Sequence, residues 1–336
     1  MGHLVITGGA GFIGANFVQW LVETEPGLEL VVVDALTYAG NLANLEPVRD
    51  RIGFERVDIT DAETMAGIVS GADGVINFAA ESHVDRSLED PAPFLRSNVT
   101  GVQVLLDLVR THSIPRFLQI STDEVYGSAP KGVHFSETDS LQPSSPYAAS
   151  KAAGDLLVLA AMHTWGLPAL ITRASNNYGP YQFPEKLLPL MITNIMENAP
   201  LPVYGDGQQR REWLHVRDHC AGIWAAWKRG EPGRIYNLST GVDVPNLEVI
   251  RTLIALMNAS EDLITFVTDR PGHDRRYALD VSRARDELGW QSEVDLADGL
   301  AETVAWYTGH RQWWEEVKSG TYREYYDRMY GSRDTL

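Results

Sequence analysis

Two short segments of the sequence carry side chains that together could move protons. Tyr147 and Lys151 are four residues apart, so in a helix their side chains would share one face. A cation beside a phenol stabilises the phenolate and lowers the phenol pKa from ~10, which makes Tyr147 a candidate base toward a substrate hydroxyl. The alternative is a solvent-exposed helix face. Because the chain has only five lysines, a lysine at this spacing is less expected by chance.

The second segment is Ser121–Gly127, which holds a hydroxyl followed by two carboxylates. Thr122 can hydrogen-bond the oxygen that Tyr147 would deprotonate. Asp123 and Glu124 come next, at a strand end where a charge without a role would be costly. Paired carboxylates in a cleft tend to have split pKa values, so that one acts as acid and the other as base. Taken alone, the two would be surface residues of a loop; their position relative to Tyr147 and to a glycine-rich loop favours a catalytic function.

That glycine-rich loop, Thr7–Gly14, follows the first predicted strand and opens the first predicted helix. Gly8 permits a tight turn, Gly11 lets the backbone approach a pyrophosphate at a helix N-terminus, and Gly14 allows close packing of helix on strand. The spacing Gly-x-x-Gly-x-x-Gly differs from the commoner Gly-x-Gly-x-x-Gly. A turn that merely needs a positive φ is the alternative, but three glycines exceed what one turn requires. The loop therefore predicts a dinucleotide site.

Acidic residues after the second and third predicted strands refine this prediction. Asp34 ends the second strand, where a carboxylate would accept hydrogen bonds from the adenosine ribose and repel a 2′-phosphate, so we expect NAD rather than NADP. A capping aspartate is the alternative. Asp58 either lies near the adenine or caps the next helix. Phe78–Ala80, at the end of the fourth strand, supplies small residues against which a cofactor can lie.

The elements that must position these residues follow from hydrophobic periodicity. Short apolar runs alternate with amphipathic stretches, which predicts βαβ units and a parallel sheet buried on both faces. The expected strands are His3–Thr7, Leu28–Val33, Gly53–Val57, Gly74–Phe78, Arg116–Ser121 and Ala169–Arg173. The expected helices are Phe12–Thr24, Ala62–Val69, Pro93–His112 and Tyr147–Trp165, and Thr60–Glu63 resembles a capping box for the second of them.

Beyond about residue 175 this rhythm stops, and prolines at 180, 184, 189, 200 and 202 interrupt the chain. The fold class we expect is α/β, a Rossmann-like doubly wound parallel sheet with a smaller, interleaved C-terminal substrate-binding lobe. Residues 1–173 would form the NAD-binding domain, with later returns near 212–240 and 280–300. Residues 174–336 would form mainly the second lobe, and the order of the polar segment Gly320–Leu336 is left open.

Composition excludes several other classes of protein. The 336 residues include 28 Lys and Arg against 45 Asp and Glu, a formal net charge of −17, which argues against a general nucleic-acid surface. The single cysteine, Cys220, rules out an internal disulfide and a cysteine-based zinc site. His215 and His219 are four apart, but no third ligand is evident, so we expect no metal. No apolar run approaches the ~18 residues of a membrane span, and we expect a cytoplasmic protein with no membrane partner.

Together these segments resemble the extended short-chain dehydrogenase/reductases that act on nucleotide sugars, from residue 4 to about residue 318. Thr7–Gly14 matches the cofactor loop of that family, Asp34–Asn41 its ribose-binding turn, and Ala79–Ser87 the stretch beside the nicotinamide. The family's epimerases usually carry small residues after the catalytic Ser or Thr, whereas its dehydratases carry Asp-Glu, as Asp123 and Glu124 do here. A protein that keeps this fold without catalysis is disfavoured by the intact Thr122, Tyr147 and Lys151.

The resemblance implies conversion of dTDP-glucose to its 4-keto-6-deoxy product plus water, with bound NAD. Tyr147 would take the proton of the glucose 4-hydroxyl, assisted by Thr122 and Lys151, while hydride leaves C4. Glu124 would then remove the C5 proton and Asp123 would protonate the departing C6 hydroxyl, before hydride returns to C6. A dehydratase or 4-epimerase for a UDP- or CDP-linked sugar is the alternative. The resemblance also implies a homodimer, formed through the helices Pro93–His112 and Ser145–Trp165.

The same resemblance assigns the binding residues. For the cofactor they are Gly8, Gly11, Phe12, Ile13, Gly14, Asp34, Leu36, Thr37, Ala39, Gly40, Asp58, Ile59, Phe78, Ala79, Ala80, Ser82, Asn98, Tyr147 and Lys151. For the nucleotide sugar they are Ser82, Thr122, Asn176, Lys186, Leu187, Pro202, Tyr204, Arg211, Asn246, Arg270, His273 and Tyr277. A guanidinium fork such as that of Arg270 suits a diphosphate, because it can bind two oxygens at once. Tyr204 could instead be a core aromatic and His273 a structural histidine.

Overall fold

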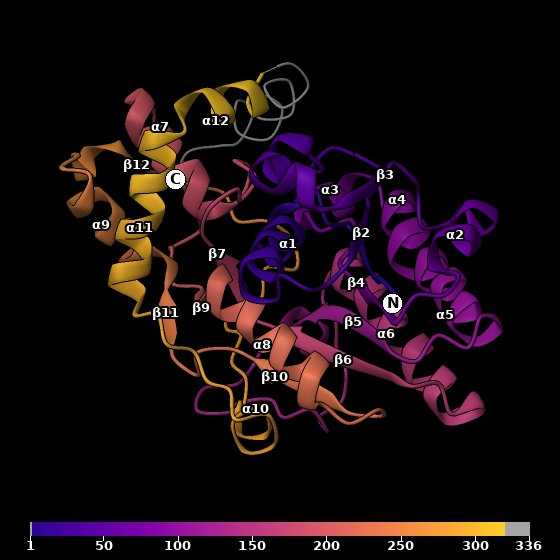
Figure 1. Cartoon of the computed structure of the whole chain (residues 1–336). Coiled ribbons are helices and arrows are strands. Elements are labelled where there is room, and N and C mark those ends of the chain that lie inside the picture. Colours follow the sequence, from indigo (N-terminus) through magenta and orange to yellow (C-terminus); the bar gives the residue numbers. More distant parts are fainter. Residues whose placement is uncertain (1, 320–336) are drawn as a thin grey trace.

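A seven-stranded parallel sheet lies at the centre of the computed structural model, which describes residues 2–319 (Figure 1). Its order is β10-β6-β5-β4-β1-β2-β3, and every neighbouring pair is parallel. The strands are β1 (Leu4–Thr7), β2 (Leu30–Val33), β3 (Gly53–Glu55), β4 (Gly74–Asn77), β5 (Phe117–Thr122), β6 (Ala169–Ala174) and β10 (Ile235–Leu238). The strand order reverses between β1 and β4, and ligands bind at such a switch point in doubly wound sheets. The structure confirms the predicted α/β fold.

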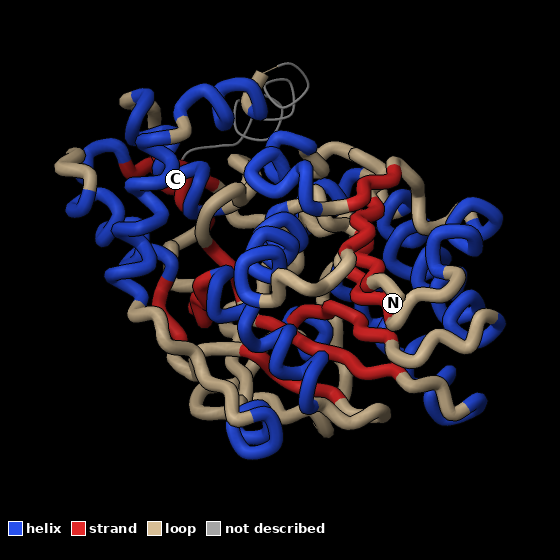
Figure 2. Tube along the Cα trace, viewed as in Figure 1, coloured by secondary structure: helices blue, strands red, loops and turns tan. Residues whose placement is uncertain are grey.

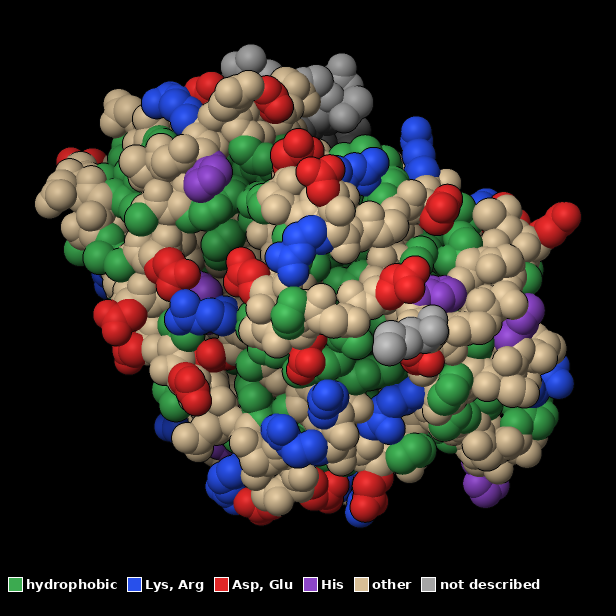
Figure 3. All heavy atoms as spheres, viewed as in Figure 1, with side chains coloured by type: hydrophobic (Ala, Val, Ile, Leu, Met, Phe, Trp, Pro, Cys, Tyr) green, Lys and Arg blue, Asp and Glu red, His purple; other side chains and the backbone are tan. Residues whose placement is uncertain are grey.

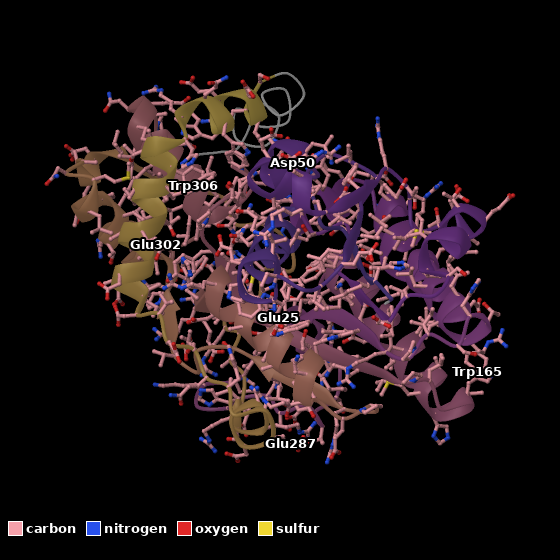
Figure 4. The ribbon with its side chains drawn as sticks, viewed as in Figure 1. Glu25, Asp50, Trp165, Glu287, Glu302 and Trp306 are labelled. Atoms are coloured by element: carbon pink, nitrogen blue, oxygen red, sulfur yellow. The ribbon has the colours of Figure 1, made fainter. Side chains whose placement is uncertain are left out.

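Helices cover both faces of this sheet, as the blue segments on either side of the red strands show in Figure 2. One face packs against α1 (Phe12–Thr24) and α8 (Val216–Arg229), the other against α2 (Ala62–Val69), α5 (Val102–Thr111) and α6 (Pro146–Trp165). Strands buried on both faces require continuous apolar runs, which β1 and β2 have. At the end of α1, Glu25 accepts a hydrogen bond from the Trp224 indole of α8 at 2.7 Å (Figure 4).

Two sequence predictions for helices need correction. The stretch predicted as one helix over Pro93–His112 consists of α4 (Ala92–Leu95), a π-helical segment (Arg96–Gly101) and α5. The capping box predicted at Thr60–Glu63 is wrong, because α2 is capped by Asp61, which accepts from the backbone N–H of Thr64. The Thr60 hydroxyl donates to Asp58 instead, so the preceding aspartate outcompetes the helix terminus for it.

A second lobe with its own apolar core lies beside the sheet, on the left of Figure 1. It has a three-stranded sheet of β7 (Asn176–Tyr178), β9 (Arg210–His215) and β11 (Asp243–Pro245), and a two-stranded sheet of β8 (Leu201–Tyr204) and β12 (Ile264–Val267). Around a separate apolar core lie α7 (Leu187–Glu197), α9 (Asn246–Leu256), α11 (Leu296–Gly309) and α12 (Arg311–Val317). The two lobes interleave in sequence, because the chain returns to the large sheet with β10 after contributing β9 to the second lobe.

The short elements complete the described chain: α3 (Val84–Glu89), α10 (Ser282–Leu288) and 3₁₀ turns at Leu42–Arg51, Asp123–Tyr126 and Glu261–Leu263. The first of these turns joins the two lobes through Asn44. Its side chain donates to the Ala10 carbonyl and accepts from the Trp313 indole of α12, both at 2.9 Å. The indole of α12 is thus connected to the glycine-rich loop through one asparagine.

Acidic and basic side chains are interspersed over the face drawn in Figure 3. Across residues 2–319, none of the helices is both long enough and apolar enough to cross a bilayer. The segment Gly320–Leu336, whose order the sequence left open, lies outside the described residues.

Candidate active site

The glycine-rich loop fits tightly against the end of β4. Gly8 has φ +70°, and a Cβ there would lie 2.4 Å from the backbone nitrogen of Ala79. A Cβ on Gly14 would lie 2.3 Å from the Gly8 carbonyl oxygen. Both positions therefore require glycine. Gly11 precedes α1, and no side chain caps that helix, so its first backbone N–H groups face the loop without a side-chain acceptor. This is the arrangement that binds a diphosphate in dinucleotide sites.

Asp34 lies at the end of β2 and is held by the backbone of this loop. Its Oδ2 accepts from the Ala10 N–H at 2.9 Å, and its Oδ1 accepts from the Leu36 N–H at 2.8 Å. Burial raises the pKa of Asp34, while these backbone N–H groups lower it. The hydrogen bonds fix the carboxylate at the cavity wall, with remaining lone pairs able to accept from a ribose.

An elongated cavity of about 290 Å³ runs from this loop along the carboxyl edge of the sheet to the start of α6. Most residues predicted to bind the cofactor line it, namely Gly8, Gly11, Phe12, Ile13, Gly14, Asp34, Thr37, Ala39, Gly40, Asp58, Ile59, Phe78, Ala79, Ala80, Ser82, Tyr147 and Lys151. Two others lie behind the wall. Leu36 packs into the core, and buried Asn98 bonds to the Glu81 backbone and to the Ser150 hydroxyl. These two support the wall and do not border the cavity.

Tyr147 and Lys151 enter this cavity from the first turns of α6, which Ser145 caps by accepting from the Ala148 N–H. Both side chains are buried. The Lys151 ammonium donates to the Ile120 carbonyl at 2.7 Å, and burial lowers the pKa of Lys151 to about 8. The Tyr147 hydroxyl is hydrogen-bonded to Thr122.

The pKa of the Tyr147 phenol differs from the sequence prediction. A neighbouring lysine was expected to lower it, but burial raises it, with a further contribution from the charge of Glu124. The Thr122 hydrogen bond lowers it only partly. The prediction is wrong for this arrangement because the ammonium is directed at the Ile120 carbonyl and because carboxylates lie nearby.

The two carboxylates after β5 have different surroundings. Asp123 is 3% exposed; its Oδ1 accepts from the Thr122 hydroxyl at 3.2 Å, and its Oδ2 has no hydrogen-bond partner among the described residues. Burial and the charge of Glu124 hold the pKa of Asp123 well above its usual range. Burial also raises the pKa of Glu124, but the positive charges of Arg270, Arg211 and Lys186 lower it. The surroundings therefore favour a protonated Asp123 beside an ionised Glu124.

A second cavity of about 160 Å³ adjoins the first, and Glu124, Asn176, Glu185 and Lys186 border both. Further residues predicted to bind the nucleotide sugar line it, namely Leu187, Pro202, Tyr204, Arg211, Asn246, Arg270 and His273. Ser82 and Thr122 line the first cavity. Tyr277 borders neither; its ring lies beneath the Arg211 guanidinium, 4.1 Å from it, and its hydroxyl donates to Asp274. Tyr277 therefore supports an arginine of the wall.

Three cations converge on this second cavity. The Arg270 guanidinium bonds to Asp85 at 3.1 Å, and the Tyr204 hydroxyl donates to the same carboxylate at 2.9 Å. Arg211 donates to two backbone carbonyls, and Lys186 donates to the Ser82 carbonyl at 2.8 Å. Among the described residues, only Arg270 of the three forms an ion pair, and Asp85, Glu124 and Glu185 also line this cavity; the donors of the three cations suit a diphosphate.

His273 and Tyr204 form one side of the cavity. Their rings meet edge to face at 5.9 Å, and the His273 Nδ1 is 2.6 Å from Asp269. Burial, with Arg270 and Arg211 nearby, lowers the pKa of His273 to about 4, so the imidazole is neutral at physiological pH. Tyr204 is partly buried at a cavity wall rather than enclosed in the core.

Sequence reasoning missed Glu185, Glu81 and His219, which line the cavities, and Arg86, which lies behind Glu185 and borders neither cavity. Arg86 bonds to Glu185 at 3.0 Å and lies over the Tyr38 ring at 4.2 Å, which joins α3 to the segment between β7 and α7. Glu81 and His219 also line the first cavity. The positions of Arg86 and Glu185 in the sequence could have indicated them, since Arg86 belongs to the Ala79–Ser87 segment and Glu185 directly precedes Lys186. The Nδ1 of His219 lies 2.8 Å from Asn177 Oδ1, and the described residues hold no cluster of three or more metal-ligating side chains.

A parallel sheet with a glycine loop at its switch point, a Tyr–Lys pair on the helix after β5 and a separate substrate lobe define an extended short-chain dehydrogenase/reductase. Residues 5–303 match the model of the GDP-mannose 4,6 dehydratase family, and the chain belongs to this family. It is 48% identical over 323 residues to the dTDP-glucose 4,6-dehydratase of Streptomyces niveus, covering 94% of this chain and 96% of that protein.

Two further comparisons agree. The dTDP-glucose 4,6-dehydratase of Streptomyces griseus is 51% identical over 319 residues, covering 94% of this chain and 97% of that protein. Among solved structures, a dTDP-glucose 4,6-dehydratase from Streptomyces venezuelae with NAD and dTDP bound has a TM-score of 0.92 at 46% identity. That match covers 94% of this chain and all of the other. The resemblance to nucleotide-sugar dehydratases is thus confirmed.

Proposed function

We propose that this protein converts dTDP-glucose to dTDP-4-keto-6-deoxyglucose and water, with NAD as a bound cofactor. The observation that carries the proposal is the position of Asp123 and Glu124. Both line the cavity that holds Tyr147 and Lys151, and Glu124 also lines the cavity of Arg211 and Arg270. Transfer of hydride alone needs no additional acid and base, whereas elimination of water needs both.

The residues present fit NAD. Gly8 and Gly14 form a cradle that a Cβ would fill, the uncapped start of α1 suits the diphosphate, and Asp34 suits the adenosine ribose. Lys151 would donate to the nicotinamide ribose. When bound, NAD supplies the redox chemistry, accepting hydride from C4 of the sugar and returning it to C6.

The residues of the chain supply the proton transfers. Tyr147, hydrogen-bonded to Thr122, is placed to take the proton of the 4-hydroxyl; because burial raises its pKa, this step would require the positive charges of Lys151 and of bound NAD to stabilise the phenolate. The ketone formed at C4 acidifies the C5 proton, and Glu124, held toward its ionised form by three cations, removes it. Asp123, held protonated by burial, gives its proton to the C6 hydroxyl, which leaves as water. Glu124 then returns its proton to C5.

The nucleotide is held by the second cavity. Arg211, Arg270 and Lys186 are positioned to bind the diphosphate, while Asn246 and Pro202 lie farther along the same wall. Asn176 borders both cavities and would contact the sugar and its diphosphate. A 4-epimerase is disfavoured by Asp123 and Glu124, which epimerisation does not require.

The direct test is incubation of the protein and NAD with dTDP-glucose, UDP-glucose and CDP-glucose in parallel, with detection of the 4-keto-6-deoxy product. We expect that product from dTDP-glucose, at a kcat/KM at least tenfold above either alternative. Faster turnover of UDP- or CDP-glucose would reassign the substrate, and interconversion of 4-epimers without loss of water would refute the dehydratase.

We also propose that residues 1–173, with returns near 212–240 and 280–300, bind NAD and that residues 174–336 mainly bind the nucleotide sugar. The packing of α8 and α10 with the large sheet supports the returns. The boundary between the two regions is tested by measuring the affinities for NAD and for the nucleotide sugar in variants that are altered on one side of it only.

A homodimer through the α5 and α6 helices is proposed as well. Leu95 and Leu156 are about half exposed on this side of the molecule, as is Trp165 at the outer end of α6 (Figure 4). Burying such side chains would favour association. Light scattering of the purified protein tests this, and a monomer at micromolar concentration would contradict it. A cytoplasmic location accords with an enzyme whose single cysteine is buried and unpaired, and fractionation of cells would test it.

A further inference from the structure

A third buried carboxyl lies behind the reactive pair, on a strand of the second lobe. Glu212, in β9, is fully buried. Its Oε2 accepts hydrogen bonds from the Ser239 hydroxyl and from the Leu279 N–H, and its Oε1 has no partner in the described part of the chain. A buried carboxyl with a vacant oxygen is costly for a fold to keep, and neither ligand proposed above contacts it.

A hydrogen-bonded connection links Glu212 to the edge of the cofactor cavity. Ser239, whose one proton is donated to Glu212, accepts from the Ser175 hydroxyl at 2.7 Å, and Ser175 borders that cavity. The register of the large sheet pairs Thr122 of β5 with Ala174 of β6. The residues that follow, Asp123 and Ser175, therefore leave the same edge of the sheet side by side. The hydrogen bonds from Glu212 thus end at Ser175, the residue beside Asp123 on the neighbouring strand.

The charged groups around Glu212 and around Asp123 determine which form of each carboxyl is favoured. Opposite Glu212 on β11 lies Asp243, which is itself bound by Arg276 and Arg210. Burial, with the charge of Asp243, raises the pKa of Glu212 to about 7, while Arg276 and the two hydrogen bonds lower it. Glu212 therefore becomes ionised near neutral pH.

Asp123 is faced by the carboxylates of Glu124 and Glu212, and by the guanidinium of Arg211. The first two favour the protonated acid and the third opposes it.

We propose that Glu212 is a positioning residue for the elimination step, whose buried carboxylate, on the strand behind the Asp123 edge of the sheet, favours the acid form of Asp123. This inference rests on the proposed function. Glu212 makes no contact with substrate or cofactor; it acts through Asp123, and oxidation of the sugar at C4 does not depend on it.

The test compares Glu212→Gln with Glu212→Asp in the enzyme loaded with NAD. Glu212→Gln removes the charge, so we expect the alkaline limb of the pH profile for product formation to move down by roughly one pH unit. We expect Glu212→Asp, which keeps a charge, to leave the limb within a few tenths of a unit. The KM for the nucleotide sugar and the rate at which the absorbance of reduced cofactor appears in a single turnover should match wild type.

An unmoved alkaline limb in Glu212→Gln overturns the inference. An equal loss of rate at every pH also overturns it, since that result indicates a structural role only. If Glu212→Gln does not fold, Ser239→Ala replaces it. Loss of that hydroxyl disfavours ionisation of Glu212, so the limb should move in the same direction by less, and an unmoved limb there likewise overturns the inference. Failure of the wild-type protein to form a 4-keto product would instead refute the proposed function.

Discussion

At the scale of single residues, the site shows how neighbours divide two adjacent carboxyls between opposite tasks. Asp123 and Glu124 differ by one methylene and follow each other in the chain. Three cations face Glu124, whereas Asp123 has one oxygen without a partner and the charge of Glu124 beside it. Burial disfavours the ionised form of both, so the cations decide which of them ionises. The acid and the base are thus assigned by surroundings rather than by residue type.

This division predicts that oxidation and elimination can be separated. In Asp123→Asn/Glu124→Gln the amides can neither donate nor accept the necessary protons, so water elimination should fall by at least about 10²-fold. Cofactor reduction by the substrate should persist, visible as the absorbance of reduced nicotinamide in a single turnover. Tyr147→Phe serves as the matched control and should lose that absorbance. Dehydration at the normal rate by the double variant would contradict the roles given to the carboxylates.

At the scale of elements, the carboxyl edge of the parallel sheet brings together residues distant in sequence. The glycine loop follows β1, Asp34 follows β2 and Phe78 follows β4. The segment from Thr122 to Glu124 comes at the end of β5. The loop is the most constrained of these, because Gly8 combines a positive φ with backbone contact to Ala79.

We therefore expect Gly8→Ala to weaken NAD binding by at least roughly tenfold and to lower the unfolding free energy by about 1–3 kcal/mol, since a Cβ must both strain the turn and displace β4. Calorimetry of the cofactor-free protein and titration with NAD measure the two effects. Gly27→Ala is the control, because that exposed glycine has no atom within 4 Å of its Cβ position. Equal NAD affinity in both variants would show that the glycine-rich loop does not bind the diphosphate of NAD.

Sequence periodicity predicted the elements of the large sheet well and those of the second lobe poorly. All six predicted strands exist within two residues of their expected bounds, because strands buried on both faces need apolar runs. β8 and β11 were not predicted, and Pro202 of β8 was among the prolines taken as interruptions. β8 belongs to a two-stranded sheet and β11 lies at the edge of a three-stranded one, and an edge strand tolerates proline because one of its sides needs no N–H.

The same limit applies to the site. Residues in linear motifs, such as Gly8 and Tyr147, were predicted by number, because local spacing positions them. Glu212 and Glu185 were missed, because they interact with residues far away in the sequence. Glu185 pairs with Arg86, and Glu212 acts on Asp123. The direction of the Tyr147 pKa was also mispredicted, because it depends on burial and on the carbonyl that Lys151 contacts. Tertiary surroundings carry that information, and a single sequence does not display it.

At the scale of the whole molecule, the two lobes meet across the cofactor cavity. Arg86 of α3 bonds to Glu185, which precedes α7, and the guanidinium covers the Tyr38 ring. The side chain of Glu185 is 2% exposed and that of Arg86 is 26% exposed, so the carboxylate end of the pair is shielded from solvent. Glu185 borders both cavities, so the pair lies beside the place where they meet.

We expect Glu185→Gln to speed dissociation of NAD, because Arg86 would keep only a neutral partner and the lobes would separate more readily. The fraction of cofactor that stays with the protein through gel filtration measures this, and it should fall severalfold. Glu261→Gln, which alters the exposed pair with Arg251, should retain as much NAD as wild type. Equal retention in the two variants would exclude the ion pair as a closure.

The bond between the Trp313 indole and Asn44 has a practical consequence. Because Asn44 also holds the carbonyl of Ala10, movement of the glycine loop alters the hydrogen bond of an indole in α12. Indole emission depends on such bonds and on solvent contact. We therefore expect Trp313 emission to change when NAD is added, and an unchanged emission would show that the cofactor does not move this loop.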